Sequence, residues 1–323
     1  MILSWSLRLL CLLLIAFGTL CAVLHLILAR CAPLLLHRLD AAPARRRERI
    51  LYQFQLAPAL AALFMATTVC IPAYLWFEPT GQAESVSPFC LLLALAAALW
   101  IGSSLLRGFR LVLRTLRFTS ACRRSGRLVQ HCGPTPVFAV ERPAHPVALF
   151  GFLRPFILVS TDMLAARRLH PDALAVALDH ERSHALHRDN WKLLSLALLP
   201  RLPRNDPWAA AWRTATDWAA DDDAVQGDAH RSLLLAETIL LAARTARSAR
   251  ALTAPVIHIA LTSAEAGLVS RIDRLLHPRP TRAEPSFVLA GLAALALLAA
   301  LSAISASPWI HSLSESLLHF GRF

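Results

Sequence analysis

This sequence lacks the paired cysteines of an oxidised or cysteine-ligated fold. Its seven cysteines show no paired spacing. Four of them, at positions 11, 21, 70 and 90, lie inside apolar runs, where cysteine acts as a small hydrophobic residue. The cysteines therefore indicate neither a disulfide framework nor a cysteine-based zinc ribbon.

Acidic residues, and charge in general, are also scarce. Asp and Glu total 21 against 33 Lys and Arg, which gives a formal net charge of +12, and charged residues make up only 17% of the chain. Hydrophobic residues make up 56%, and the mean hydropathy is +0.50. A chain of 323 residues with this composition is too apolar for a soluble globular protein and longer than an anchor needs to be.

Four stretches are long and uncharged enough to cross the hydrocarbon core of a bilayer, which needs about 20 helical residues. They cover residues 9–29, 54–77, 88–106 and 287–310. The first run is longer than the apolar core of a cleavable signal peptide, so we expect it to stay in the mature protein. The sequence thus predicts a mainly α-helical integral membrane protein with four transmembrane helices.

The arginines indicate which way these spans face. Six of them follow the first span between residues 30 and 49, whereas residues 78–87, between spans two and three, include two glutamates and no basic residue. Further arginines follow span three and precede span four. By the positive-inside rule, we expect both termini outside and the segment between spans three and four in the cytoplasm.

This topology divides the chain into five parts. They are a three-span region (1–106), a basic juxtamembrane helix (107–132), a cytoplasmic domain (133–284), a fourth transmembrane helix (285–310) and a short extracytoplasmic tail (311–323). Arginines at 107, 110, 114 and 117 recur at helical spacing with apolar residues between them, so we expect the juxtamembrane helix to lie along anionic lipid. Direct nucleic-acid binding is the weaker reading of the positive charge.

The cytoplasmic domain is predicted to be an α+β unit. Short apolar runs at 137–140, 147–150 and 156–159 are separated by Pro and Gly, which is typical of strands in a small sheet. The predicted helices run from Pro171 to Asn190, from Trp208 to Gln226, and from a cap at Asp228 to about Arg247. A final helix follows a capping box of Thr262 with Glu265 and ends before Pro278.

The first of these helices contains the motif His180-Glu181-Arg182-Ser183-His184. Histidines four residues apart are one helical turn apart, so both imidazoles can bind one tetrahedral zinc ion. Glu181 lies beside them and could take a proton from the attacking water and pass it to the leaving amine. The alternative is a solvated polar face of an ordinary helix, but the apolar stretches on either side of the motif favour the zinc site.

A hydrolytic zinc site normally has three protein ligands, so another residue is needed. His187 is about 10 Å along the helix axis from His180, too far to share the ion without distortion. Asp217 and Asp221, one turn apart on the following helix, are better candidates, because one could bind zinc while the other orients a histidine ligand. The run from Asp221 to Asp223 could instead be a solvated face.

In the order of these motifs, the chain resembles the BlaR/MecR-type membrane metallopeptidases, the antirepressor class of zinc proteases. The matching segments are residues 151–158, residues 180–190 with their Arg188-Asp189-Asn190 ending, residues 217–225 and residues 271–276. The resemblance implies a zincin-like metalloprotease domain between spans three and four. It also implies a bacterial inner (cytoplasmic) membrane, with the active site facing the cytoplasm.

The resemblance further implies roles for the two aspartates. The family motif is similar to Glu-x-x-x-Asp, which makes Asp217 the third zinc ligand and Asp221 a residue that orients a ligand. Because aspartate is one methylene shorter than glutamate, we expect a closer helix, a different carboxylate geometry or a lower metal affinity. Both tyrosines fall in the predicted second span, so oxyanion stabilisation would come from zinc or from His145, Arg188 or His258.

The leading hypothesis is therefore a zinc endopeptidase that cuts a cytoplasmic protein, which by resemblance would be a transcriptional repressor in signal transduction. The extracellular sensor of drug-sensing members does not follow the last span, so a signal would come through a sensor partner protein, the spans or the outer loop. One alternative is a non-catalytic signalling or scaffold protein with a degenerate zinc site, against which the intact Glu181 argues. The other is a housekeeping membrane protease of the HtpX type, which lacks the Arg-Asp-Asn extension.

Overall fold

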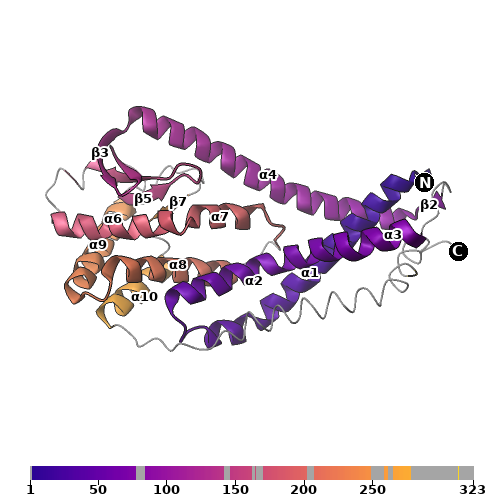
Figure 1. The fold of residues 1–323 in the computed structure, drawn as a ribbon, viewed down its shortest axis with the longest axis horizontal. Helices are drawn as coiled ribbons and strands as arrows, with labels where there is room; N and C mark the ends of the chain where they lie inside the picture. Colours follow the sequence, from indigo (N-terminus) through magenta and orange to yellow (C-terminus); the bar gives the residue numbers. More distant parts are fainter. Residues whose placement is uncertain are drawn as a thin grey trace.

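The structure is a computed structural model that describes residues 2–77, 84–141, 146–161, 164, 170–201, 207–248, 258–260, 265–277 and 312. It is mostly helical, with a small mixed sheet. The sheet lies at one end of the molecule with helices α6, α9 and α10, and the long helices α1, α2 and α4 extend toward the other end (Figure 1).

Three of the described helices are long and apolar enough to cross a membrane, judged by length and composition. They are α1 (Trp5–Arg38), the continuous run of α2 (Ala44–Met65), the π-helical η1 (Ala66–Cys70) and α3 (Ile71–Phe77), and α4 (Pro88–Ser125). They contain the first three predicted spans. The fourth predicted span, residues 287–310, lies outside the described residues.

The predicted juxtamembrane helix is not a separate element. Helix α4 continues without a break from Pro88 to Ser125, so the arginines at 107, 110, 114 and 117 belong to the same helix as the third span. Residues beyond it form a strand, β3 (Arg127–Cys132), and not a helix. Gly102 and Gly108 lie close to the junction of the apolar and basic parts, but the helix continues through both of them. It ends before Gly126, which adopts an extended conformation.

The main sheet contains the three predicted strands, namely β4 (Thr135–Val140), β5 (Val147–Phe150) and β6 (Phe156–Ser160). It also contains β3 and β7 (His258–Ala260), which the sequence did not predict. The strand order is β3-β4-β6-β5-β7, antiparallel except for the parallel pair β4 and β6. A separate two-stranded pair joins β1 (Ile2–Leu3) to β2 (Glu84–Ser85).

Five more of the described helices belong to this end of the molecule, and α6 and α7 among them contact the sheet directly. They are α6 (Pro171–Leu186), α7 (Asp189–Leu198), α8 (Pro207–Val225), α9 (Ala229–Ser248) and α10 (Glu265–Leu276). The helix predicted to reach Asn190 ends four residues earlier, because Arg188 adopts the left-handed conformation (φ 54°) and a new helix begins at Asp189. Asp228 caps α9 as predicted, since its side chain accepts the N–H of His230.

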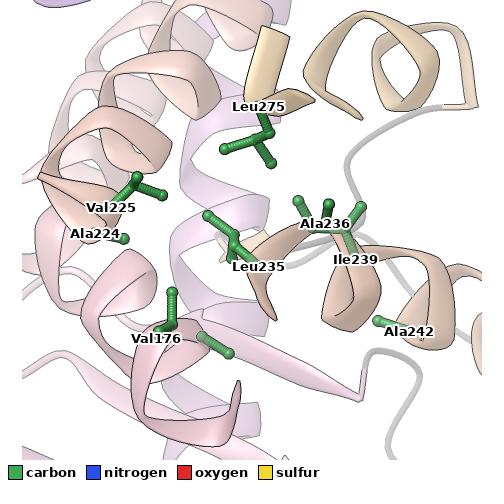
Figure 2. Close-up of a cluster of buried hydrophobic side chains, with 9 residues drawn as sticks. Val176, Ala224, Val225, Leu235, Ala236, Ile239, Ala242 and Leu275 are labelled. Atoms are coloured by element: carbon green, nitrogen blue, oxygen red, sulfur yellow. The ribbon is translucent and has the colours of Figure 1, made fainter. Parts of the chain in front are cut away.

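The core of the helical part lies where α6, α8, α9 and α10 meet. Val176, Val225, Leu235 and Leu275 point toward one another there, together with several buried alanines (Figure 2). Leu235 is fully buried. This packing fixes α6 and α8 side by side, which determines where their polar side chains meet.

A second core joins helix α2 to α8. Ile50, Leu51 and Phe54 of α2 pack with Trp208 and Trp212 of α8 in one buried cluster. The end of α2 that precedes the predicted second span therefore forms part of the folded domain. Helix α2, part of a candidate membrane span, therefore shares a core with α8, although the sequence predicted them in separate parts of the chain.

Candidate metal centre

Helix α6 places both motif histidines on its buried side. His180 and His184 are fully buried, and their Nε2 atoms are 3.2 Å apart. The ring planes are nearly perpendicular, at 87°. A tetrahedral zinc ion with Zn–N bonds of about 2.0–2.1 Å places two ligand nitrogens about 3.3 Å apart. The two histidines thus have the spacing of zinc ligands.

Helix α8 supplies the third candidate ligand, Asp217. Its Oδ1 lies 3.9 Å from Nε2 of His184, and ligand atoms of His180, His184 and Asp217 all lie within 4.8 Å of one another. Small residues allow α8 to approach α6 closely, because Ala177 and Ala224 are fully buried in the same cluster.

A carboxylate faces the other ring nitrogen of each histidine. Nδ1 of His184 donates to Oδ2 of Asp189 at 2.9 Å. Nδ1 of His180 lies 2.8 Å from Oδ1 of Asp221, although the ring N–H does not point straight at that oxygen. Carboxylates in these positions keep the proton on Nδ1 and leave Nε2 as the metal-binding atom. Asp221 thus lies beside His180.

Arg271 of α10 provides a buried positive charge in the cluster. Its guanidinium donates to both oxygens of Asp221, at 2.9 and 2.7 Å, and is 1% exposed. It also lies 3.8 Å from Oδ2 of Asp217. One oxygen of Asp217 therefore faces His184 and the other faces Arg271, so Arg271 helps to orient both carboxylates of α8.

Glu181 contacts the sheet from the same helix as the histidines. Its Oε2 accepts the N–H of Leu149 in β5 at 2.8 Å, and its side chain is fully buried. Its Oε1 has no hydrogen-bond partner within the part of the chain that the structure describes. An unpaired buried carboxylate oxygen costs free energy unless water or a ligand reaches it. This oxygen is therefore available to accept a proton.

Burial shifts the pKa values of these groups. It lowers the pKa of His180 to about 4 and raises the pKa of Glu181 to about 7. Burial also lowers the pKa of His184, but the hydrogen bond and charge of Asp189 outweigh this effect and the net shift is upward. His180 is therefore neutral at physiological pH and can bind a metal ion without losing a proton.

A cavity of about 350 Å³ lies beside His184. Phe152, Leu153 and Trp191 contribute apolar side chains to its lining, and Arg188 contributes a charged one. Asn190 holds the lining together, because its amide donates to the carbonyl of Gly151 at 2.7 Å. The cavity is large enough for a substrate side chain next to the candidate metal centre.

Several other sequence predictions have a clear outcome in the structure. His187 is not part of the cluster, since its Nδ1 bonds to the carbonyl of Ser183. The aspartate run is divided: Asp221 is buried, whereas the side chains of Asp222 and Asp223 are 50% and 43% exposed.

Of the three residues predicted as candidates for stabilising the oxyanion, one lies at the candidate site. Arg188 lines the cavity, whereas His145 and the side chain of His258 lie outside the described residues. Tyr52 lies on α2, two residues before the predicted second span begins, so it does not belong to that span; its hydroxyl bonds to the hydroxyl of Ser195 on α7.

Sequence reasoning gave no role to Asp189 or Arg271. Asp189 immediately follows the helix break at Arg188. Because the sequence analysis predicted an unbroken helix to Asn190, it did not place Asp189 next to His184. The position of Arg271 in the sequence, by contrast, does indicate that it is buried and paired. It shares a helical stripe with the apolar residues Leu268, Ile272 and Leu275, and an arginine on a buried face requires a carboxylate partner.

No protein-family model matches the chain, and no protein of curated function matches it. The family resemblance of its motifs therefore stays a prediction. The function has to be argued from the cluster itself.

Proposed function

We propose that this protein is a membrane-bound zinc endopeptidase whose metal ligands are His180, His184 and Asp217. The observation that supports it most directly is the buried cluster of these three side chains beside the unpaired Oε1 of Glu181. Two histidines and one carboxylate are the ligands of many hydrolytic zinc sites, which keep a fourth position open. The resemblance to the antirepressor metallopeptidases points to the same chemistry.

The residues around the cluster fit peptide hydrolysis. Zinc held by His180, His184 and Asp217 would supply Lewis acidity for polarising a carbonyl and lowering the pKa of water. Glu181 acts as the general base through Oε1, while the N–H of Leu149 holds its other oxygen in place. The pKa of about 7 given to Glu181 by burial suits a group that accepts a proton and then donates it to the leaving amine.

The cavity next to His184 binds a substrate side chain in this proposal. Phe152, Leu153 and Trp191 give one part of its lining an apolar surface, which favours an apolar side chain there. Arg188 lies in the same lining and is the candidate among the predicted residues for stabilising the oxyanion. The arginine distribution of the sequence orients the site toward the cytoplasm, so the substrate is a cytoplasmic protein, and by resemblance a transcriptional regulator.

Metal content and proteolysis test the proposal together. We expect the purified full-length protein in lipid nanodiscs to contain about one zinc per chain by mass spectrometry. It should cleave members of a library of unstructured peptides. Glu181→Gln should keep the zinc and lose cleavage by a factor of roughly 10² to 10⁴, the usual contribution of a general base.

A suitable control is Glu237→Gln, which removes an exposed glutamate of α9 and should change neither measurement. Absence of bound zinc in the wild-type protein would contradict the proposal. Equal cleavage by the Glu181→Gln variant would exclude the assigned base, and zinc binding without any cleavage would favour a non-catalytic signalling role.

A further inference from the structure

A chain of buried ionic contacts leads from helix α2 to the candidate zinc ligand His184. Oε1 of Glu48 accepts from Nζ of Lys192 at 3.0 Å, and the same Nζ donates to Oδ1 of Asp189 at 2.7 Å. The other oxygen of Asp189 accepts from Nδ1 of His184 at 2.9 Å. Charge-assisted hydrogen bonds of this length are strong and directional, so each group constrains the next.

The burial of these groups shows that the contacts are not ordinary surface ion pairs. Glu48, Asp189 and His184 are all fully buried, and Lys192 is 20% exposed. Lys192 is the single lysine in a chain that otherwise uses arginine. A compact ammonium can donate to two carboxylates on different helices, whereas the planar fork of arginine favours a single bidentate partner.

Glu48 also contacts the helix that carries the third ligand. Its Oε1 accepts from the indole N–H of Trp212 at 3.2 Å, and Trp212 lies on α8, one helix with Asp217. Glu48 precedes the predicted second span by only six residues. One side chain at the cytoplasmic end of an apolar helix is thus linked to both elements that supply metal ligands.

We propose that Glu48 is a positioning residue for the metal centre, acting through Lys192 and Asp189 on the imidazole of His184. Glu48 fixes the ammonium, the ammonium fixes the carboxylate of Asp189, and that carboxylate sets the tautomer and orientation of the ligand. The inference rests on the metal centre proposed above. Its consequence is that the affinity for zinc depends on where helix α2 lies, which makes a membrane helix part of the site.

Zinc affinity of the full-length protein in nanodiscs tests this, measured by competition with a chromophoric chelator. Glu48→Gln keeps the shape and an acceptor for Trp212 but removes the charge. We expect it to weaken zinc binding by roughly threefold to tenfold, less than the roughly 10–100-fold loss typical of a direct partner such as Asp189. Lys192→Gln interrupts the same chain and should weaken binding at least as much.

The double variant distinguishes positioning from general destabilisation. If Glu48 acts through Asp189, adding Glu48→Gln to Asp189→Asn should change the affinity by less than about twofold, because coupled residues are not additive. Gln55→Leu is the matched control. Gln55 is a buried polar residue of the same helix, and its amide donates to the carbonyl of Trp208. Its replacement should lower the melting temperature of the zinc-free protein and leave the zinc affinity unchanged.

An unchanged affinity in Glu48→Gln would overturn the inference, and so would a loss that persists in the Asp189→Asn background or an equal loss in Gln55→Leu. These results would leave the proposed peptidase in place, provided that the wild-type protein binds zinc. Failure of the wild-type protein to bind zinc would overturn both.

Discussion

The side chains around His180 and His184 form a cluster in which acidic groups outnumber basic ones. Asp189, Asp217 and Asp221 are all buried within it. Arg271 pairs with Asp221 and lies 3.8 Å from Asp217, and Lys192 pairs with Asp189. Arg271 also lies 3.5 Å from Nε2 of His180, so it contributes positive charge close to the candidate metal ligands. The carboxylates still outnumber these two cations, and a divalent cation held by the histidines and Asp217 would offset the excess negative charge.

Substitutions of the two aspartates of α8 should have distinct effects on zinc. We expect Asp217→Ala to remove a ligand and abolish stoichiometric zinc, and Asp221→Ala to weaken binding by roughly 10–100-fold, because it orients His180 and pairs with Arg271. Asp222→Ala is the control on the same helix, and it should leave the affinity unchanged. Retained zinc in both of the first two variants would place the third ligand elsewhere.

The cavity predicts a change in substrate preference. Leu153 is 65% exposed, so Leu153→Asp should be tolerated by the fold. A carboxylate in the lining should lower kcat/KM for peptides with a large apolar side chain at the cleavage site by roughly 10-fold or more, since burial of a Leu or Phe side chain is worth about 1.5–3 kcal/mol. Zinc content should stay at the wild-type level, and a uniform loss for all peptides would contradict the assigned subsite.

At the scale of elements, close contacts between helices hold the site in place. Helix α4 extends beyond the predicted third span and packs with α7, the helix that begins at Asp189. A Cβ added at Gly108 of α4 would clash with the side chain of Leu198 on α7, whereas a Cβ added at Gly102 would meet nothing within 4 Å. A larger residue at 108 therefore requires Leu198 to move or the two helices to separate.

This pair of glycines gives a matched test of the packing. Gly108→Ala should force α4 and α7 apart and lower the melting temperature, because overpacking typically costs about 1–3 kcal/mol. Gly102→Ala should leave it unchanged or raise it slightly, since alanine favours the helix. Thermal unfolding of both variants in the same detergent compares them, and an equal response would show that α4 and α7 do not pack as described.

At the scale of the whole molecule, the apolar helices and the domain form one folded unit. Helix α2 contributes to the core with Trp208 and Trp212 and provides Glu48 to the contacts that reach His184. Metal binding should therefore stabilise more than the local site, because the ligands come from α6 and α8 and both helices belong to shared cores.

Removal of the metal should make that stabilisation visible. A ligand that binds only the folded state at 100 times its dissociation constant adds about 2.7 kcal/mol to the free energy of unfolding. We expect a chelator to lower the melting temperature of the full-length protein by several degrees and added zinc to restore it. The Asp217→Ala variant should show no chelator effect; a comparable shift in that variant would mean that the chelator acts at another site.

The sequence by itself determined the features that depend on short-range periodicity. Apolar runs of sufficient length predicted three of the described helices, alternation with Pro and Gly predicted β4, β5 and β6, and the four-residue spacing of His180 and His184 put both rings on one side of a helix. It also selected Asp217 and Asp221 as a pair, because they too are one turn apart.

Only the tertiary structure decided how separate elements meet. The left-handed conformation of Arg188 directs Asp189 toward His184. The buried alanines of α6 and α8 let Asp217 lie close to the histidines. Helix α10 places Arg271 against Asp221, which is fifty residues earlier in the chain. Glu48 reaches the same centre from a helix that the sequence assigned to the membrane region. Contacts between residues far apart in the chain depend on how the elements pack, and packing leaves no periodic signal in the sequence.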